Sequence, residues 1–251
     1  MQYLFTPEGE AALESVMRLR PLLAFDFDGT LAPIVDRPDD AAVPRPVARS
    51  LRQLAGSLPI AIITGRSVAD VRPRLGFEPH FVIGNHGIEN PHDDADQGAE
   101  HALDALRLRI AAQDAALLRA GVAVEDKGYS LALHYRLAPD AGAALASIDA
   151  TLQGFTPELR RFGGKCVVNV VAAGVPDKGD ALAAVVERCG ARAAVFFGDD
   201  VNDEAVFARA VPPWLTVRIG RDPASAAMYM LESDRELASV LQRMIALLAG
   251  S

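Results

Sequence analysis

The chain has 251 residues, half of them hydrophobic, and carries a formal net charge of −8 with a sequence pI of about 5.1. That length and apolar fraction suffice for one large domain, or for a domain that carries a smaller insertion. The acidic balance argues against non-specific binding to nucleic acid or to an anionic membrane, so an anionic substrate has to meet local cations.

The cysteines and the N-terminus bear on where the protein works. Cys166 and Cys189 are far apart and form no Cys-x-x-Cys pattern, which favours two ordinary thiols in a reducing compartment. The N-terminus carries Glu8 and Glu10 without an apolar run of signal-peptide length, and no segment reaches the roughly 18 apolar residues of a membrane span. We therefore expect a soluble, cytoplasmic monomer or small oligomer that binds neither nucleic acid nor membrane.

Short apolar runs alternate with amphipathic segments as far as Asn90. We expect a helix over 10–18 that starts near Thr6-Pro7, strands over 22–25, 58–63 and 81–83, a proline-rich loop over 33–46, and helices over 47–54 and 68–75, the last interrupted by Pro73. This alternation of strand and helix is typical of a parallel sheet.

The pattern changes after Asn90, where the polar residues 91–97 suggest a hinge. There follow a helix over 99–120, strands over 121–126 and 129–135, a helix over 140–152, and strands over 160–162 and 166–171 that turn around Gly163, Gly164 and Lys165. This repeated order of helix, strand and strand predicts a small α+β domain with an antiparallel sheet, which returns to the core near 174–176.

The strand–helix alternation then resumes. We expect helices over 180–188, 203–208 and 237–248, and strands over 193–197 and 215–219. The sequence therefore predicts an α/β protein. Its Rossmann-like core, with a parallel sheet, consists of 1–90 and 175–251, and its inserted α+β domain spans 91–174.

An acidic pair ends the first predicted strand, since residues 22–25 lead directly into Asp26 and Asp28. Open α/β sheets place their chemistry at the carboxyl ends of strands, and two carboxylates one residue apart in extended backbone point to the same side. They can hold a cation together, or one can attack while the other moves protons. A plain turn at Asp28-Gly29 is the alternative. A calcium loop is not, because the closing Glu is absent.

Three further groups of polar residues follow elements of the predicted core. In chain order they are Thr64 with Gly65 and Arg66, then Lys178, then Asp199 with Asp200 and Asp203. Alone, each has a plain interpretation, as a turn, a surface lysine or a helix cap. Their joint placement, each just after its strand or at its helix start, is far harder to obtain by chance.

With these motifs the chain resembles the haloacid dehalogenase superfamily of phosphatases. The matching segments are Asp26-Phe27-Asp28-Gly29-Thr30, Thr64, Lys178 and Gly198-Asp199-Asp200-Val201-Asn202-Asp203. The resemblance covers both halves of the core, and it implies a parallel-sheet core with an inserted cap domain of the type called C2B.

The chemistry of a phosphate monoester suggests a role for each residue, because the charge must be neutralised and the reacting atoms placed in line. Asp26 can attack phosphorus and form an aspartyl phosphate. Lys178 can balance Asp26 and hold a phosphoryl oxygen. Thr64 can offer its hydroxyl, and its loop at Gly65 and Arg66 can offer backbone N–H groups.

Proton transfer and charge balance complete the expected site. Asp28 can protonate the leaving alkoxide and later take a proton from the attacking water. Mg²⁺ is the expected cofactor, because two anions must meet and hard oxygen ligands are at hand. We expect Asp26, the backbone carbonyl of Asp28 and Asp199 to bind it, with Asp203 reaching the same site, directly or through water.

The inserted segment carries the residues expected to choose the substrate. Its strands mix cations with a carboxylate, which suits a phosphorylated polyol because cations meet phosphate and Glu meets hydroxyls. The residues are Glu125, Lys127, His134, Arg136, Arg160, Arg161 and Lys165. For any one of them, an exposed edge charge is the alternative.

Within the superfamily, the chain is similar to trehalose-6-phosphate phosphatases over 84–89 (GNHGIE), 125–136 (EDKGYSLALHYR), 164–169 (GKCVVN) and 177–182 (DKGDAL). The resemblance implies that the disaccharide phosphate is bound by Glu125, Lys127, Arg136 and Lys165 and by the loop around His86 and Gly87. Asn169 stands where the family usually has Glu, and its neutral amide can still hydrogen-bond sugar hydroxyls.

We therefore expect an enzyme of trehalose biosynthesis that hydrolyses trehalose 6-phosphate to trehalose and phosphate through Asp26 and Mg²⁺. The nearest alternative is the same chemistry on another sugar phosphate, such as sucrose 6-phosphate or mannosyl-3-phosphoglycerate. A non-catalytic phosphosugar sensor is expected to lose the nucleophile or a metal ligand, and a phosphomutase is expected to retain a phosphorylated sugar.

Overall fold

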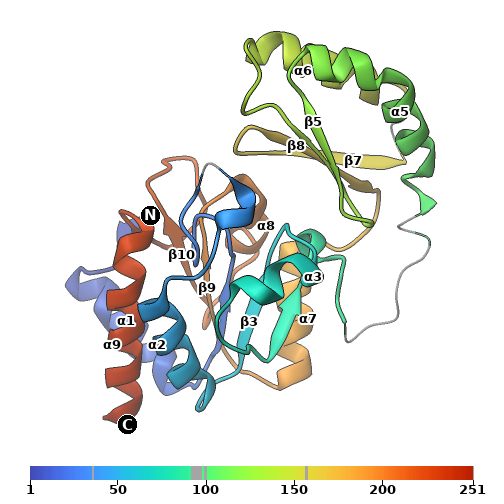
Figure 1. The fold of residues 1–251 in the computed structure, drawn as a ribbon. Coiled ribbons are helices and arrows are strands. Elements are labelled where there is room, and N and C mark those ends of the chain that lie inside the picture. Colours follow the sequence, from blue (N-terminus) through green and yellow to red (C-terminus); the bar gives the residue numbers. More distant parts are fainter. Residues whose placement is uncertain (36, 92–97, 99–100, 156–157, 251) are drawn as a thin grey trace. The chain divides into compact units, whose positions relative to one another are not determined.

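The structure is a computed structural model, which describes the chain apart from residues 36, 92–97, 99–100, 156–157 and 251 (Figure 1). The chain divides into two compact units. The core unit consists of Met1–Asn90 and Pro176–Ser251, and the cap unit of Pro91–Val175. That these units are independent domains with the expected boundaries stays a prediction, and the hinge expected at 91–97 lies almost entirely outside the described residues.

In the described part of the core unit, the strands form a seven-stranded parallel sheet. Their spatial order is β1 (Gln2–Tyr3), β11 (Tyr229–Leu231), β10 (Leu215–Ile219), β9 (Ala194–Gly198), β2 (Leu22–Phe25), β3 (Ile60–Ile63) and β4 (Phe81–Ile83). From β2, the chain adds strands first toward β4 and later toward β1. The carboxyl end of β2 is therefore the switch point at which open α/β sheets bind ligands.

Helices cover both faces of this sheet (Figure 1). Successive residues of a strand point to opposite sides, so the apolar residues of β2 need a covering helix on each face. Leu23 and Phe25 belong to one hydrophobic cluster and Leu22 and Ala24 to the other. The first face is covered by α1 (Pro7–Arg18), α2 (Arg45–Ala55) and α9 (Leu237–Ala249), and the second by α7 (Lys178–Cys189) and α8 (Glu204–Phe207). The switch point thus lies at the end of a strand that is buried on both faces.

Short helical segments form the turns around the carboxyl edge. They are η1 (Pro38–Asp40), α3 (Val68–Val71), η2 (Arg72–Arg74), η3 (Asn85–Gly87), η4 (Val201–Asp203) and η5 (Asp234–Glu236). The start of α1 at Pro7, with Thr6 as its N-cap, confirms the predicted helix start. The helix expected over 68–75 is divided between α3 and η2, because Pro73 interrupts the α-helical pattern as predicted.

The cap unit contains a four-stranded antiparallel sheet in the order β5 (Ala123–Asp126), β6 (Leu131–His134), β8 (Val167–Ala172) and β7 (Leu159–Gly164). Helices α5 (Asp104–Arg119) and α6 (Ala141–Leu152) pack on one face of it. Leu131, Leu133 and Val170 of the sheet join Leu106 and Ile148 of the helices in one buried cluster. The expected α+β architecture is therefore present.

Two details of the cap unit differ from the sequence prediction. Gly163 and Gly164 were expected in a turn, but they lie in β7 and pair with β8. The turn comes later, at Cys166, which has a φ of 62°. The helix expected to begin near residue 99 is continuous only from Asp104, as far as the structure describes this segment.

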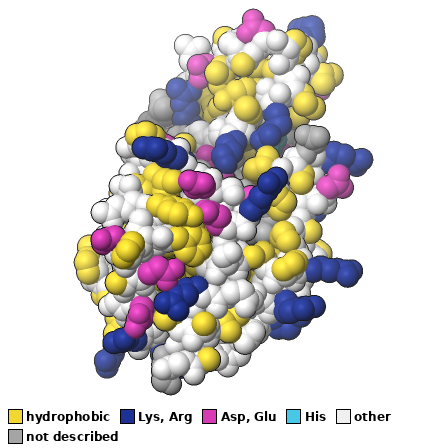
Figure 2. Space-filling view, turned by 90° about the vertical axis from the view of Figure 1, so that its left-hand side faces the viewer, with side chains coloured by type: hydrophobic (Ala, Val, Ile, Leu, Met, Phe, Trp, Pro, Cys, Tyr) yellow, Lys and Arg dark blue, Asp and Glu magenta, His cyan; other side chains and the backbone are white. Residues whose placement is uncertain are grey.

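Acidic and basic side chains are interspersed with hydrophobic ones on the face of the molecule shown in Figure 2. Such mixing agrees with the expectation that an anionic substrate is bound by particular cations and not by a broad field. Among the described residues, the helices are all too short or too polar to traverse a lipid bilayer.

Helix α5 offers a matched test of how the cap unit is held together. Leu106 is fully buried and Leu108, two residues on, is 75% exposed. We predict that Leu106→Ala lowers the free energy of unfolding by about 2–5 kcal/mol, since it leaves a cavity, and that Leu108→Ala changes it by less than about 0.5 kcal/mol. Hydrogen exchange of the β5–β8 amides during urea titration measures both, and equal effects would contradict the packing described.

Candidate active site

Asp26 meets Lys178 and Asp203 at the carboxyl end of the parallel sheet. The backbone N–H of Asp26 donates to the carbonyl of Phe197 in β9 (2.8 Å), which fixes it beside that strand. Lys178 begins α7, and its Nζ lies 3.0 Å from Asp26 Oδ1 and 2.7 Å from Asp203 Oδ1. Lys178 is 1% exposed, which excludes its plain interpretation as a surface lysine.

Burial and charge act against each other in this cluster. Burial raises the pKa of Asp26 well above its ordinary value, Lys178 lowers it, and Asp203 and Asp199 raise it further. Burial lowers the pKa of Lys178, but Asp203 and Asp26 outweigh that effect and raise it above its ordinary value. Lys178 is therefore a stable cation. The raised pKa of Asp26 reflects its burial among other acidic groups, and a further cation would favour its carboxylate form.

Asp203 organises the loop that follows β9. Its Oδ2 accepts from the backbone N–H groups of Asp199 (2.9 Å) and Asp200 (3.0 Å), while Oδ1 accepts from Lys178. Gly198 permits this approach, because a Cβ at that position would lie 2.4 Å from Asp203 Cγ. Both carboxylate oxygens of Asp203 thus hold parts of the protein in place, which favours a positioning role.

Asp26, Asp199 and Asp203 form a buried group with ligand oxygens within 4.8 Å of one another. Carboxylate oxygens at this spacing are the donors that hard divalent cations prefer, so the residues present fit such an ion. Gly29, with a φ of 79°, lets the chain pass Asp199 closely, since a Cβ there would lie 2.1 Å from Asp199 Oδ2. Thr30, the last residue of the motif that begins at Asp26, donates to Asp199 Oδ1 at 3.4 Å.

The carboxylate of Asp28 has different surroundings from that of Asp26. Arg66 Nε donates to Asp28 Oδ2 (2.7 Å) and Arg66 Nη2 to Asp28 Oδ1 (2.8 Å), a bidentate pair. The side chain of Asp28 is 39% exposed, whereas that of Asp26 is 6% exposed. Both acids lie beyond the regular strand, which ends at Phe25, so their side chains need not point to the same side. Asp26 faces the buried Lys178, and Asp28 faces Arg66 of the loop after β3.

Thr64 follows β3 directly, at the strand end where the sequence predicts it, and it is fully buried. Its Oγ1 accepts from the backbone N–H of Arg66 (3.2 Å), and its carbonyl accepts from the N–H of His86 (2.9 Å). The N–H of Arg66, expected to meet a phosphoryl group, is therefore engaged within its own loop. Gly65 packs against His86, because a Cβ there would lie 2.4 Å from the ring Cε1.

The loop after β4 connects these residues to the start of α7. Gly87, with a φ of 116°, packs on the backbone of Asp177, the N-cap of α7, so that a Cβ would lie 2.5 Å from the Asp177 carbonyl oxygen. His86, with a φ of 62°, is buried beside Gly65. The structure thus brings His86 and Gly87 to the same edge as Thr64 and Lys178.

Glu89 ties the two loops together, a role that the sequence analysis did not assign. Its Oε2 accepts from the backbone N–H of Val68 (2.9 Å) and from Asn85 Nδ2 (2.8 Å). Gly84 makes room for it, since a Cβ there would lie 2.6 Å from Glu89 Oε2. The sequence around Glu89 gives no local sign of its contact with Val68, because that contact depends on how the strands are arranged.

The cap sheet presents polar residues on the face that does not pack against its helices. Glu125 pairs with Ala132 in register, and Ala132 with Asn169, so Glu125 and Asn169 lie on one face. His134 Nε2 lies 3.0 Å from Glu125 Oε2, and Lys127 Nζ lies 3.6 Å from the same oxygen. The hydrogen bond from His134 lowers the pKa of Glu125, burial raises it, and Lys127 lowers it further. Glu125 is therefore held as a carboxylate.

The other cap residues singled out in the sequence separate into two groups. Arg136 Nη2 donates to the backbone carbonyl of Lys165 (3.2 Å), which places both at the end of the sheet near the β7–β8 turn. Arg161 instead pairs with Asp149 of α6 at 2.5 Å, on the face that carries the helices. Arg161 therefore has a structural partner. Arg160, the preceding residue of β7, points to the opposite, polar face of the sheet, the face that carries Asn169.

Comparison with known proteins bears on this arrangement. The family described as trehalose-phosphatase matches residues 24–213. The chain belongs to the trehalose-phosphatase family. It is 32% identical over 240 residues to a trehalose-phosphate phosphatase of Mycobacterium ulcerans, which aligns with 90% of this chain. The chain spans 61% of the length of that relative.

Solved structures share the fold of this family member. The C-terminal domain of the trehalose-6-phosphate phosphatase of C. albicans matches with a TM-score of 0.73 and 21% identity, over 94% of this chain and 96% of that one. A haloacid dehalogenase-like hydrolase from Bacteroides thetaiotaomicron matches with a TM-score of 0.63 and 15% identity, over 89% of this chain and 99% of that one. These similarities confirm the predicted fold class.

Removal of Lys178 tests the charge balance of the buried cluster. We predict that Lys178→Met lowers the free energy of unfolding by about 3 kcal/mol in the presence of a chelator, because Asp26 and Asp203 lose their buried counter-charge. The control is Arg209→Met, since Arg209 is 48% exposed, pairs with Asp177 and Asp180 near the start of the same helix, and contributes less than about 1 kcal/mol. Urea denaturation measures both, and a smaller loss for Lys178→Met than for the control would contradict the account.

Asp70 provides a test by pH. Burial raises its pKa, but hydrogen bonds from Arg74 and Arg66 outweigh this and lower it below the ordinary value of 3.8. A lowered pKa stabilises the folded state above the unfolded-state pKa, and the stabilisation is lost as the pH falls through the folded-state value. We predict that Asp70→Asn melts below the wild type at pH 7 and that the gap narrows as the pH falls below 3.8. Differential scanning calorimetry measures it, and a constant gap would contradict the assignment.

Proposed function

We propose that the protein is a Mg²⁺-dependent phosphatase that hydrolyses trehalose 6-phosphate to trehalose and phosphate. The observation that carries this proposal is the buried pairing of Asp26 with Lys178 at 3.0 Å, beside the carboxylates of Asp199 and Asp203. Membership of the trehalose-phosphatase family, and the name of the Mycobacterium ulcerans relative, support the choice of substrate.

The proposed first step joins Asp26 to phosphorus. A carboxylate oxygen of Asp26 attacks, the bond between phosphorus and the sugar oxygen breaks, and an aspartyl phosphate results. Lys178 keeps Asp26 in place and compensates charge on a phosphoryl oxygen. Thr64, at the adjoining strand end, offers its hydroxyl to the phosphoryl group.

Asp28 moves the protons in this proposal. It gives a proton to the leaving sugar oxygen, then takes one from the water that attacks phosphorus and releases Asp26. Its half-exposed position, apart from the Lys178 cluster, suits a group that must exchange protons while Asp26 stays shielded.

Asp26 and Asp199 would bind Mg²⁺ together with the backbone carbonyl of Asp28, and Asp203 would hold the Asp199 loop or reach the ion through water. The ion supplies positive charge that offsets the repulsion between the phosphate and the carboxylates. Asp200 lies on the same loop, where its backbone carbonyl accepts from Arg218 (3.4 Å).

The cap unit would supply the contacts with the sugar. Glu125 and Asn169 share one face of its sheet and offer acceptors and an amide to hydroxyls, while Lys127, Arg136 and Lys165 lie near that face or at its end. Asn169 replaces a carboxylate usual in the family, so one sugar contact is neutral here. We also propose that the protein works in the cytoplasm as a monomer or small oligomer. The free thiols of Cys166 and Cys189 support a reducing compartment.

A panel of sugar phosphates tests the proposed substrate. We predict that trehalose 6-phosphate gives a kcat/KM at least about tenfold above sucrose 6-phosphate, mannosyl-3-phosphoglycerate and glucose 6-phosphate, the size of effect that a few hydrogen bonds to hydroxyls give. Phosphate release should fall to background in a chelator and return with Mg²⁺. A faster rate on another sugar would overturn the substrate and leave the phosphatase. No release from any would overturn both.

Asp26→Asn tests the nucleophile. We predict a loss of at least about 10³-fold in kcat, since the amide cannot form the acyl phosphate. The melting temperature should not fall, because the change removes a negative charge from a buried acidic cluster. Asp149→Asn, on the exposed surface of the cap unit, is the control and should retain full activity. Substantial turnover by Asp26→Asn would contradict the nucleophile assignment.

A further inference from the structure

Arg66 is held on several sides by the core unit. Nε and Nη2 donate to Asp28, Nη1 donates to Asp70 Oδ2 (2.6 Å), and Nη2 also donates to the carbonyl of Pro38 (2.9 Å). The guanidinium carbon lies 5.2 Å from the centre of the Phe27 ring. The side chain is 11% exposed, so little of this arginine is presented to solvent.

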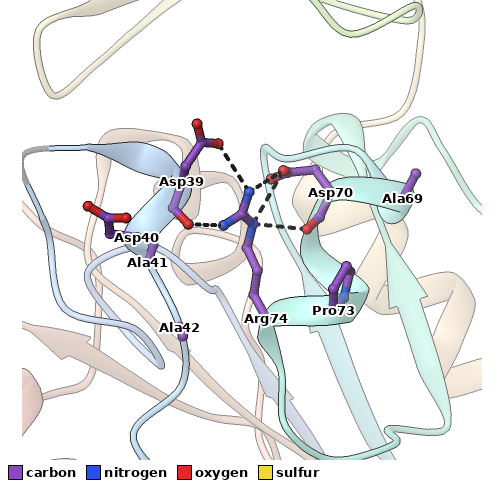
Figure 3. Close-up of a pocket in the computed structure, with 8 residues that line it drawn as sticks. All are labelled: Asp39, Asp40, Ala41, Ala42, Ala69, Asp70, Pro73 and Arg74. Atoms are coloured by element: carbon purple, nitrogen blue, oxygen red, sulfur yellow. Dashed lines mark hydrogen bonds and ion pairs between the residues drawn. The ribbon is translucent and has the colours of Figure 1, made fainter.

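Asp70, which accepts from Arg66, also pairs with Arg74, and Figure 3 shows how Arg74 in turn contacts Asp39. Asp70 Oδ1 accepts from Arg74 Nη2 (2.7 Å), and Arg74 also donates to the backbone carbonyl and, at 3.3 Å, to the carboxylate of Asp39. The chain Asp28–Arg66–Asp70–Arg74–Asp39 therefore links the end of β2, the α3–η2 segment and the η1 turn. A cavity of about 400 Å³ lies beside its outer end, lined in part by Asp39, Asp70 and Arg74.

This geometry differs from that of a residue that binds substrate directly. An arginine that recognises phosphate presents its N–H fork outward, whereas the Nε and Nη2 edge of Arg66 is occupied by the two oxygens of Asp28. It also differs from a surface ion pair, because Arg66 is buried more deeply than its partners Asp28 and Asp70. What Arg66 fixes is the direction of the Asp28 side chain.

We propose that Arg66 is the positioning residue for Asp28, and that Asp70 and Arg74 keep Arg66 in register with the η1 turn. The inference rests on the proposed function, in which Asp28 carries the protons. An aspartate at a half-exposed turn can rotate about both side-chain torsions, and proton transfer needs it within hydrogen-bond reach of the sugar oxygen. A planar bidentate partner restricts both torsions, which a single-point contact from lysine does not.

The leaving group gives a readout that a purely structural role does not move. A sugar alkoxide needs a proton from Asp28 as it leaves, whereas p-nitrophenolate leaves without one. We predict that Arg66→Met lowers kcat/KM for trehalose 6-phosphate by about 10–100-fold, which is part of the roughly 10²–10⁴-fold that general acid–base catalysis supplies. For p-nitrophenyl phosphate we predict a loss of less than about threefold. Arg66→Lys should fall between Arg66→Met and the wild type.

A double-variant cycle tests whether Arg66 acts through Asp28. If it does, the double variant that combines Asp28→Ala with Arg66→Met has the same kcat/KM for trehalose 6-phosphate as Asp28→Ala alone, within about threefold. Arg72→Met is the matched control, because Arg72 lies six residues on, is 45% exposed and pairs with the exposed Glu78. It should match the wild type on both substrates.

The opposite outcomes would overturn the inference. If Arg66→Met lowers kcat/KM equally on both substrates, and if its loss multiplies with that of Asp28→Ala in the double variant, Arg66 acts on the phosphate or on the fold. If Arg66→Met leaves the activity unchanged, Asp28 needs no partner. If the wild type prefers another sugar phosphate, the proposed substrate fails and the cycle is measured on that sugar. If the wild type hydrolyses no phosphate ester at all, both proposals fail.

Discussion

The buried pairing of Lys178 with Asp26 and Asp203 is the interaction on which the rest of the site depends. A lysine this deeply buried is stable only if carboxylates surround it, because taking its charge out of water is costly. The chain meets that requirement by bringing together the end of β2, the start of α7 and the loop after β9. Glycines at 29 and 198 allow the approach, since any side chain there would overlap a carboxylate.

The burial of Lys178 also gives the two acids that follow β2 different surroundings. Asp26 is enclosed with Lys178, where negative charge is in excess and a divalent cation fits. Asp28, past the end of the strand, is instead held by Arg66 at the margin of the site. The proposed nucleophile and the proposed proton carrier thus occupy different environments, although only one residue separates them.

Local patterns predicted most of the fold and the meeting of Asp26, Lys178 and Asp203 at the carboxyl edge of the parallel sheet. The apolar run before Asp26 and the proline at the start of α1 act within a few residues, so the sequence shows them directly. The two-residue β1 and three-residue β11 were missed because they are too short to display alternation. The pairing of Arg66 with Asp28 and the contact of Glu89 with Val68 were not predicted, since both join segments that only the sheet order brings together.

The central claim is that Asp26, held by Lys178, becomes phosphorylated during turnover. The direct measurement is acid quenching of the enzyme within milliseconds of mixing with ³²P-labelled trehalose 6-phosphate and Mg²⁺, followed by digestion and peptide mapping. The account predicts base-labile label on the peptide that contains Asp26, and none in Asp26→Asn. Label on another peptide, or turnover by an enzyme that never carries label, would contradict it.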